Sequence, residues 1–124
     1  MVIDFIEKGS ADCPLIRLYN LTFTEYDELT RQIDKLIKGE TNFISLNSIL
    51  NLEKSIGLEF VTSTEDKGIV VLGSNSYRLE LSISSFKEVK DKILFSNDGK
   101  YINSHQWLSD HGGISLLLSQ DGNW

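Results

Sequence analysis

Two histidines and an aspartate near the end of the chain are the residues whose types best fit chemistry at a site. His105, Asp110 and His111 lie close together in the sequence. Neutral imidazole and carboxylate groups bind zinc and other divalent cations, and a hairpin would bring the two ends of this segment together. Their spacing matches no defined metal motif, and three ligands leave a closed tetrahedral site incomplete. We therefore predict no metal site and no cofactor. The alternative is a small metal-dependent or hydrolytic enzyme that uses these three residues.

Other candidate groups lack the surroundings that catalysis needs. The single cysteine, Cys13, would need a nearby imidazole to populate its thiolate, and the sequence around it matches no nucleophile motif. Glu65 and Asp66 are adjacent acids, but general acid–base chemistry needs carboxyl groups that converge in a cleft. Gly112 and Gly113 lack the lysine and the helix start of a phosphate-binding loop. We predict no catalytic residue.

Aromatic residues near the chain end are better suited to binding. Tyr101 and Trp107 fall on one face of a predicted strand with an asparagine and a histidine, which makes that face more polar than a core face. One possibility is that this face lines a pocket or an interface. The other is that the two aromatic rings lie at the edge of the core. The final residue, Trp124, either packs back onto the domain or is presented to a partner. The predicted binding residues are Tyr101, Asn103, His105, Trp107, Asp110, His111 and Trp124.

Two helices are predicted by their capping sequences. The segment Thr22-Phe23-Thr24-Glu25 fits a capping box, and apolar residues then recur at spacings of three and four as far as Gly39. These signals predict a helix over residues 23–38. A second capping box, Ser85-Phe86-Lys87-Glu88, predicts a helix that begins there and ends at residues 97–99.

The remaining apolar segments are typical of strands. We predict buried strands at residues 15–21 and 43–46, and then a three-strand meander with a period of two along the chain. The last two apolar stretches, 101–108 and 114–119, flank a loop that suits a hairpin. The meander strands are predicted at residues 58–63, 69–72 and 77–81.

These elements favour an α+β fold. Because helices and strands do not alternate regularly, we predict a mostly antiparallel sheet of about five to seven strands with two helices packed on it. The 124 residues suit a single domain, residues 1–124, with residues 1–14 as an N-terminal arm and a linker that contains the only proline. The arm is expected to dock as an edge strand or as a partial helical turn.

Charge and hydropathy argue against two classes of partner. The net charge is −6, and the lysines at 87, 90 and 92 are interleaved with acids, so we predict no nucleic-acid binding. No apolar run of about 18 residues exists, so we predict no membrane association. The N-terminus lacks the pattern of a signal peptide, and we expect a cytoplasmic protein.

The two ends of the chain resemble those of short uncharacterised bacterial proteins. The resemblance lies in residues 13–19, Gln106-Trp107-Leu108, residues 114–119 and the segment 121–124. It implies no activity and transfers no functional residue. By size, acidity and lack of catalytic motifs, the chain also looks like the toxin-neutralising immunity proteins of bacteria. We predict a non-enzymatic domain that binds another protein or a second copy of itself, with the immunity function and the enzyme above as alternatives.

Overall fold

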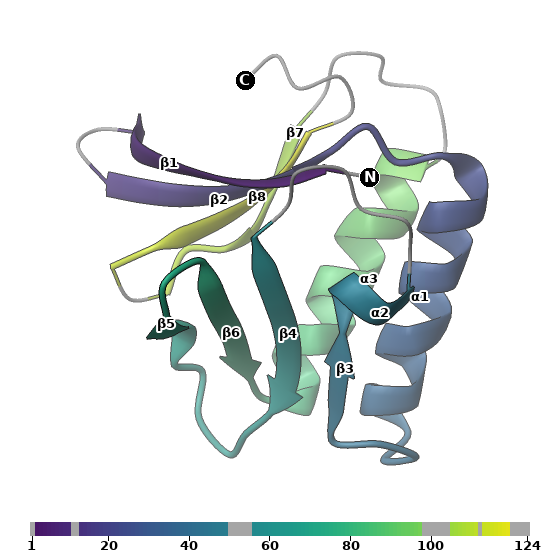
Figure 1. Cartoon of the computed structure of the whole chain (residues 1–124). Helices are drawn as coiled ribbons and strands as arrows, with labels where there is room; N and C mark the ends of the chain where they lie inside the picture. Colours follow the sequence, from purple (N-terminus) through teal and green to yellow (C-terminus); the bar gives the residue numbers. More distant parts are fainter. Residues whose placement is uncertain (1, 11–12, 50–55, 98–104, 112, 120–124) are drawn as a thin grey trace.

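A computed structural model describes residues 2–10, 13–49, 56–97, 105–111 and 113–119 of the chain (Figure 1). These residues form an α+β fold, with three helices and two four-stranded sheets rather than one larger antiparallel sheet. Sheet A has the strand order β1-β2-β8-β7, and sheet B has the order β3-β4-β6-β5. The elements are β1 (Val2–Ser10), β2 (Cys13–Tyr19), α1 (Phe23–Ile37), β3 (Phe43–Ser45), α2 (Leu46–Ile49), β4 (Gly57–Thr62), β5 (Gly68–Gly73), β6 (Ser76–Leu81), α3 (Ile83–Asn97), β7 (His105–Ser109) and β8 (Ser115–Ser119).

The first long helix, α1, is built as its sequence predicts. The Thr22 hydroxyl accepts a hydrogen bond from the Glu25 backbone at 3.2 Å, and the Glu25 carboxylate accepts one from the Thr22 backbone at 2.9 Å. This capping box satisfies two backbone N–H groups that the helix itself leaves unpaired. The helix ends at the C-cap residue Lys38, followed by Gly39 with a φ of 75°. The predicted start and capping box are therefore confirmed, and the helix ends one residue before the predicted bound.

The second long helix, α3, begins earlier than its sequence predicts. Ser82, and not Ser85, provides the capping hydroxyl, which accepts a hydrogen bond from the Ser85 backbone at 3.2 Å. The backbone N–H of Ser82 donates to the Asp66 carboxylate at 2.8 Å. Asp66 thus takes the part that a glutamate three residues into the helix plays in a capping box. Because this acid lies in the β4–β5 connection, the local sequence could not reveal the true start.

Sheet B is not the predicted meander. Strand β6 lies between β4 and β5, so β4 and β6 pair in parallel and only β5 and β6 form an antiparallel hairpin. The central position of β6 agrees with its burial, since Tyr77, Leu79 and Leu81 are all buried on one face. A period of two identifies a strand and its buried face, but it does not identify the neighbouring strand.

Sheet A joins the two ends of the chain. Strand β1 is an edge strand that pairs antiparallel with β2, and Cys13 and Pro14 are the first residues of β2 instead of a linker. Strand β2 then pairs in parallel with β8. The predicted C-terminal hairpin is confirmed by the antiparallel pairing of β7 with β8.

The two sheets share one pattern and one buried core. In each sheet a parallel pair of central strands is flanked by two antiparallel edge strands, and all of sheet B lies in the sequence between α1 and α3 (Figure 1). Residues of both sheets, of α1 and of α3 form one buried apolar cluster. Phe60 of sheet B and Phe86 of α3 meet in it, with ring centroids 5.7 Å apart. Within the described ranges, no helix is long and apolar enough to cross a membrane.

Candidate functional site

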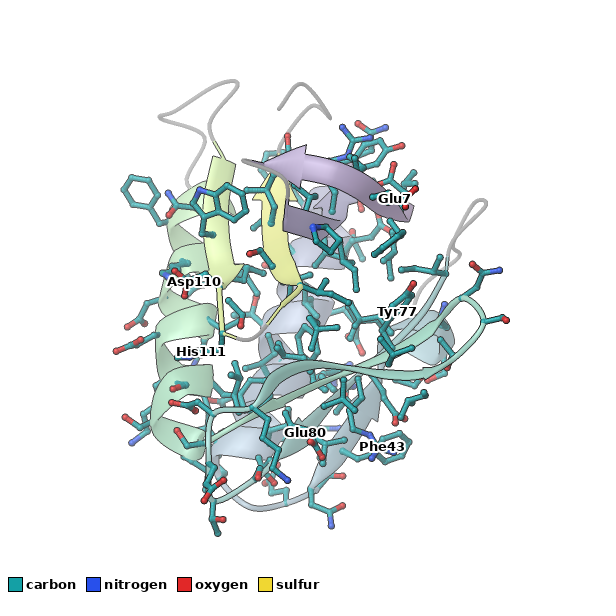
Figure 2. The ribbon with its side chains drawn as sticks, turned by 90° about the vertical axis from the view of Figure 1, so that its left-hand side faces the viewer. Glu7, Phe43, Tyr77, Glu80, Asp110 and His111 are labelled. Carbon is teal, nitrogen blue, oxygen red and sulfur yellow. The ribbon has the colours of Figure 1, made fainter. Side chains whose placement is uncertain are left out.

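Three of the predicted binding residues line one small pocket. Trp107, Asp110 and His111 face helix α3 across a cavity of about 110 Å³, and Figure 2 shows Asp110 and His111 beside that helix. His105 is the first residue of β7, but its side chain lies outside the described part of the structure. The predicted binding residues Tyr101, Asn103 and Trp124 also lie outside the described residues.

This pocket, which we call the α3 pocket, is lined by a residue whose hydroxyl group has no partner among the described residues. Ser109 is only 5% exposed, and its Oγ makes no hydrogen bond to any part of the chain that the structure describes. Beside it, the Lys92 ammonium group donates a hydrogen bond to the Trp107 carbonyl at 2.7 Å. The cavity is smaller than the roughly 300–1,000 Å³ of typical ligand sites. It has room for water or a very small polar molecule.

Asp66 connects the α3 pocket to the start of helix α3. Its carboxylate accepts hydrogen bonds from the Ser82 backbone and from the Ser85 hydroxyl, each at 2.8 Å. These bonds hold the pKa of Asp66 below its usual value, and the charge of His111 acts in the same direction. Among the described residues, no three His, Cys, Asp or Glu side chains are grouped so that they could hold a metal ion.

A much larger groove, of about 630 Å³, lies between helix α1 and strand β3. We call it the α1–β3 groove. Its volume falls within the roughly 300–1,000 Å³ of ligand sites. Its lining residues come from α1, from the turn before β3, from β3 and from α2, namely Glu28, Gln32, Lys35, Glu40, Thr41, Phe43, Ile44, Ser45 and Ser48.

One wall of the α1–β3 groove is a helix face and the other is the edge of a sheet. Glu28, Gln32 and Lys35 are spaced by four and three residues, which places them on one face of α1. On the other side, all three residues of β3 line the groove. Since successive strand side chains point to opposite faces, a wall formed by three consecutive residues must include the backbone edge of the strand. Strand β3 is indeed the edge strand of sheet B.

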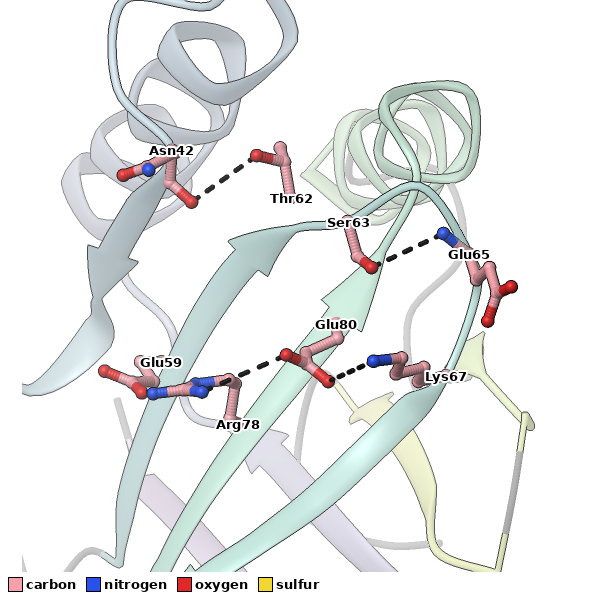
Figure 3. A network of polar contacts seen from close by, with 8 residues as sticks. All are labelled: Asn42, Glu59, Thr62, Ser63, Glu65, Lys67, Arg78 and Glu80. Carbon is pink, nitrogen blue, oxygen red and sulfur yellow. Dashed lines mark hydrogen bonds and ion pairs between the residues drawn. The ribbon is translucent and has the colours of Figure 1, made fainter.

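The backbone pairing of β3 shows which of its polar groups point toward this edge. The Thr62 N–H donates to the Asn42 carbonyl at 3.1 Å, and Figure 3 shows the side chain of Thr62 turned toward the same oxygen. In an antiparallel pair, residues that bond to the partner strand alternate with residues that face away from it. Because Asn42 bonds toward β4, Ile44 does so as well. The N–H and C=O groups of Phe43 and the N–H of Ser45 therefore point away from β4, toward the free edge, whereas the C=O of Ser45, the residue before α2, is the first acceptor of that helix.

A side-chain hydroxyl group covers most of these outward groups. The Thr41 hydroxyl donates to the Phe43 carbonyl at 2.9 Å and accepts from the Phe43 N–H at 3.4 Å. The Ser48 hydroxyl donates to the Ser45 carbonyl at 3.0 Å. Both outward backbone groups of Phe43 are thus paired with a hydroxyl and not with a neighbouring strand, whereas the Ser48 bond lies within the first turn of α2.

The charged side chains that line the α1–β3 groove are two carboxylates and one ammonium group, and one of the carboxylates, that of Glu28, forms an ion pair with Arg31 of the same helix. Hydrogen bonds from the Arg31 and Gln32 side chains lower the pKa of Glu28, so its carboxylate stays ionised. Glu40 adds a second carboxylate, and Lys35 supplies the opposing positive charge. Phe43, which is 49% exposed, adds an apolar surface.

The outer face of sheet B is a third polar surface, but its charges are balanced within the sheet. Arg78 of β6 contacts Glu59 of β4 at 2.7 Å and Glu80 at 3.9 Å, and Glu80 lies 4.0 Å from Lys67 (Figure 3). Alternating charges across neighbouring strands satisfy one another without a partner molecule. The edge of β3 is therefore a better candidate for binding a ligand than this face.

Sequence patterns pointed to the α3 pocket but not to the α1–β3 groove. The polar stripe on α1 looks like an ordinary solvated helix face, and Phe43 looks like a core residue in a short apolar segment. One signal was present: Phe43 and Ile44 are adjacent in a strand, so they cannot both face the core.

Comparison with protein families, with curated protein sequences and with solved structures gives no match. The function of the groove and of the pocket therefore has to be inferred from their own side chains and backbone.

Proposed function

We propose that this protein is a non-enzymatic protein-binding domain whose partner docks in the α1–β3 groove. The observation that carries the proposal is the combination of a groove of about 630 Å³ with an edge strand along one wall. An edge strand offers backbone groups for pairing with another chain. Phe43 adds an exposed aromatic side chain, which is the kind of residue that anchors protein interfaces.

A partner with positive charge suits this groove best. Two of its three charged side chains, Glu28 and Glu40, are carboxylates, and the whole chain carries a net charge of −6. Complementary charge speeds association and disfavours acidic partners. A toxin-neutralising immunity protein for a basic toxin is one specific form of this function, and the groove charge favours it.

The enzymatic alternative belongs to the α3 pocket. Asp110 and His111 lie there with Ser109, whose buried hydroxyl has no partner in the described part of the chain. A hydrolytic function would require these groups to act on a substrate much smaller than a peptide, because the pocket holds only about 110 Å³. A loss of partner binding after changes in the α1–β3 groove, with none after His111→Ala, would separate the two functions.

The experiment compares two exposed phenylalanines. Intact protein, Phe43→Ser and Phe95→Ser are used to recover cross-linked partners from the native cell, and each partner is quantified by mass spectrometry. Phe95 is the matched control because it is similarly exposed, at 44%, but lies on α3. We expect Phe43→Ser to lower recovery of one partner more than about tenfold, since an anchoring aromatic contributes 2 kcal/mol or more. Equal recovery with both variants would refute the groove as the binding site.

A further inference from the structure

We infer that the α1–β3 groove takes an extended, basic segment of the partner, which pairs with β3 as a fifth strand of sheet B. This inference rests on the proposed function, because it names the kind of partner segment that the groove receives. It follows from the direction of the backbone groups of β3, from the position of α1 and from the charges between them.

The first argument is the exchange of hydrogen bonds. The outward C=O and N–H groups of Phe43 are both bonded to the hydroxyl group of Thr41. A hydroxyl can rotate away, and an incoming strand can then supply an N–H or C=O group in its place. The edge is therefore covered while the groove is empty, which limits unwanted pairing, and it remains open to a strand that fits.

The second argument concerns the side chains that such a strand would present. Neighbouring strands lie about 4.8 Å apart and their side chains alternate between the two faces of the sheet. On the outer face the added strand would meet Phe43, which is exposed, and on the inner face it would lie next to α1, as the buried Ile44 does. A β-branched or aromatic residue pairs well with Phe43 across the strands.

The third argument is charge. Residues of the added strand that face α1 approach the stripe that contains Glu28, whose carboxylate is bonded to Arg31 and Gln32 of the same helix. Glu40 lies at the same groove. A lysine or arginine on this side of the segment would form ion pairs there, whereas an acid would be repelled. The expected segment thus alternates basic residues with β-branched or aromatic ones.

The experiment selects peptides from a random library of about twelve-residue segments displayed on phage. The bait is the intact protein, and the recovered peptides are then measured in solution against variants of it. Ser45→Pro removes one outward N–H and places a ring at the free edge, and it removes no hydrogen bond between β3 and β4. Ser45→Ala is the matched control, because it deletes the side chain and keeps the N–H.

We expect the recovered peptides to be basic and alternating, and to bind Ser45→Ala as they bind the intact protein. Their affinity for Ser45→Pro should fall at least about tenfold, as should the affinity of peptides N-methylated at alternate residues. The second measurement keeps the test valid if Ser45→Pro fails to fold. Glu28→Gln with Glu40→Gln should weaken binding about three- to tenfold, whereas the exposed turn variant Glu65→Gln should not.

Equal affinity for the proline and alanine variants, or for methylated and unmethylated peptides, would overturn strand addition. Recovery of acidic or uncharged peptides would overturn the charge argument. If Phe43→Ser abolishes recovery of the native partner but no peptide is selected, the groove binds a folded surface and only this inference fails. If Phe43→Ser leaves recovery of the native partner unchanged and no peptide is selected, the proposed function fails as well.

Discussion

Gly68 packs against the backbone of His111 so closely that a Cβ atom added to Gly68 would lie 2.2 Å from the His111 carbonyl oxygen. This contact joins the start of β5 in sheet B to the loop before β8 in sheet A. Gly68 also has a φ of 81°, which disfavours any side chain. We expect Gly68→Ala to lower the free energy of unfolding by about 2–4 kcal/mol, measured by urea denaturation.

Gly39 provides the control for this clash. It also has a positive φ, of 75°, but nothing lies within 4 Å of an added Cβ. Gly39→Ala should therefore show only the backbone cost, about 1–2 kcal/mol. If both alanine variants lose the same stability, the contact between Gly68 and His111 is looser than we describe.

Asp34 should make stability depend on acid pH. Its carboxylate contacts Lys38 of the same helix and Lys90 of α3, each at 2.8 Å. Hydrogen bonds from these two ammonium groups lower the pKa of Asp34 from 3.8 to about 2, and the bond from Lys38 has the larger effect. A lowered folded-state pKa gives stability that is present above the unfolded value and is lost as pH falls through the folded value. The contribution should therefore disappear between about pH 4 and about pH 2.

The test is a comparison of urea midpoints for intact protein and Asp34→Asn. The difference between them should be constant near neutral pH and should shrink toward about pH 2. Asp27→Asn, on the exposed side of α1, is the control for adding an asparagine to this helix. A difference that does not change with pH would show that the contacts with Lys38 and Lys90 are not formed in solution.

Ser109 should be replaceable without loss of stability if its hydroxyl has no partner. Removing an unpaired buried hydroxyl relieves a desolvation cost, so Ser109→Ala should leave the free energy of unfolding unchanged or raise it by up to about 1 kcal/mol. Ser85→Ala, in the same α3 pocket, should lower it by about 1 kcal/mol because Ser85 donates to Asp66. A clear loss for Ser109→Ala in urea denaturation would reveal a bound water or ligand in that pocket.

Position 47 should require an amide side chain, which can both donate and accept a hydrogen bond. The Nδ2 of Asn47 donates to the Ile56 carbonyl at 3.0 Å, and its Oδ1 accepts from the Leu58 N–H at 2.9 Å, so the side chain continues the pairing of β4 beyond β3. Asn47→Asp loses the donor and sets a carboxylate beside the Ile56 carbonyl. It should cost about 1–2 kcal/mol in thermal or urea denaturation. Asn42→Asp should lower the free energy of unfolding by less than about 0.5 kcal/mol, because Asn42 bonds to Thr62 through its backbone carbonyl and not through its side-chain amide.

Local features of this fold followed from local sequence. The Thr22–Glu25 capping box and the apolar spacing after it predicted α1 correctly, because both signals lie within the helix itself. The start of α3 was wrong by three residues, since its cap depends on Asp66 in a distant turn. Strand order was also wrong in sheet B, because a period of two is the same whichever strand lies alongside.

Of the two candidate sites, the α3 pocket could be predicted from local sequence and the α1–β3 groove could not. Asp110 and His111 were predicted as binding residues within the loop of a hairpin, and both line one pocket. The α1–β3 groove depends on how α1 lies against the edge of β3, which no periodicity within either element reveals. The role of the Thr41 hydroxyl at the free edge follows only from the direction of the β3 backbone.

The parallel pair of β2 and β8 determines when this chain can finish folding during its synthesis. Leu15 pairs with Ser115, so about 100 residues separate the two strands in the sequence. At about 5–20 residues per second, a ribosome needs about 5–20 s to make the intervening segment. All of sheet B is complete before β8 emerges, whereas β2 must wait with an open, apolar edge. Strand β8 is thus the late-translated strand that covers the open edge of β2 and protects it from aggregation.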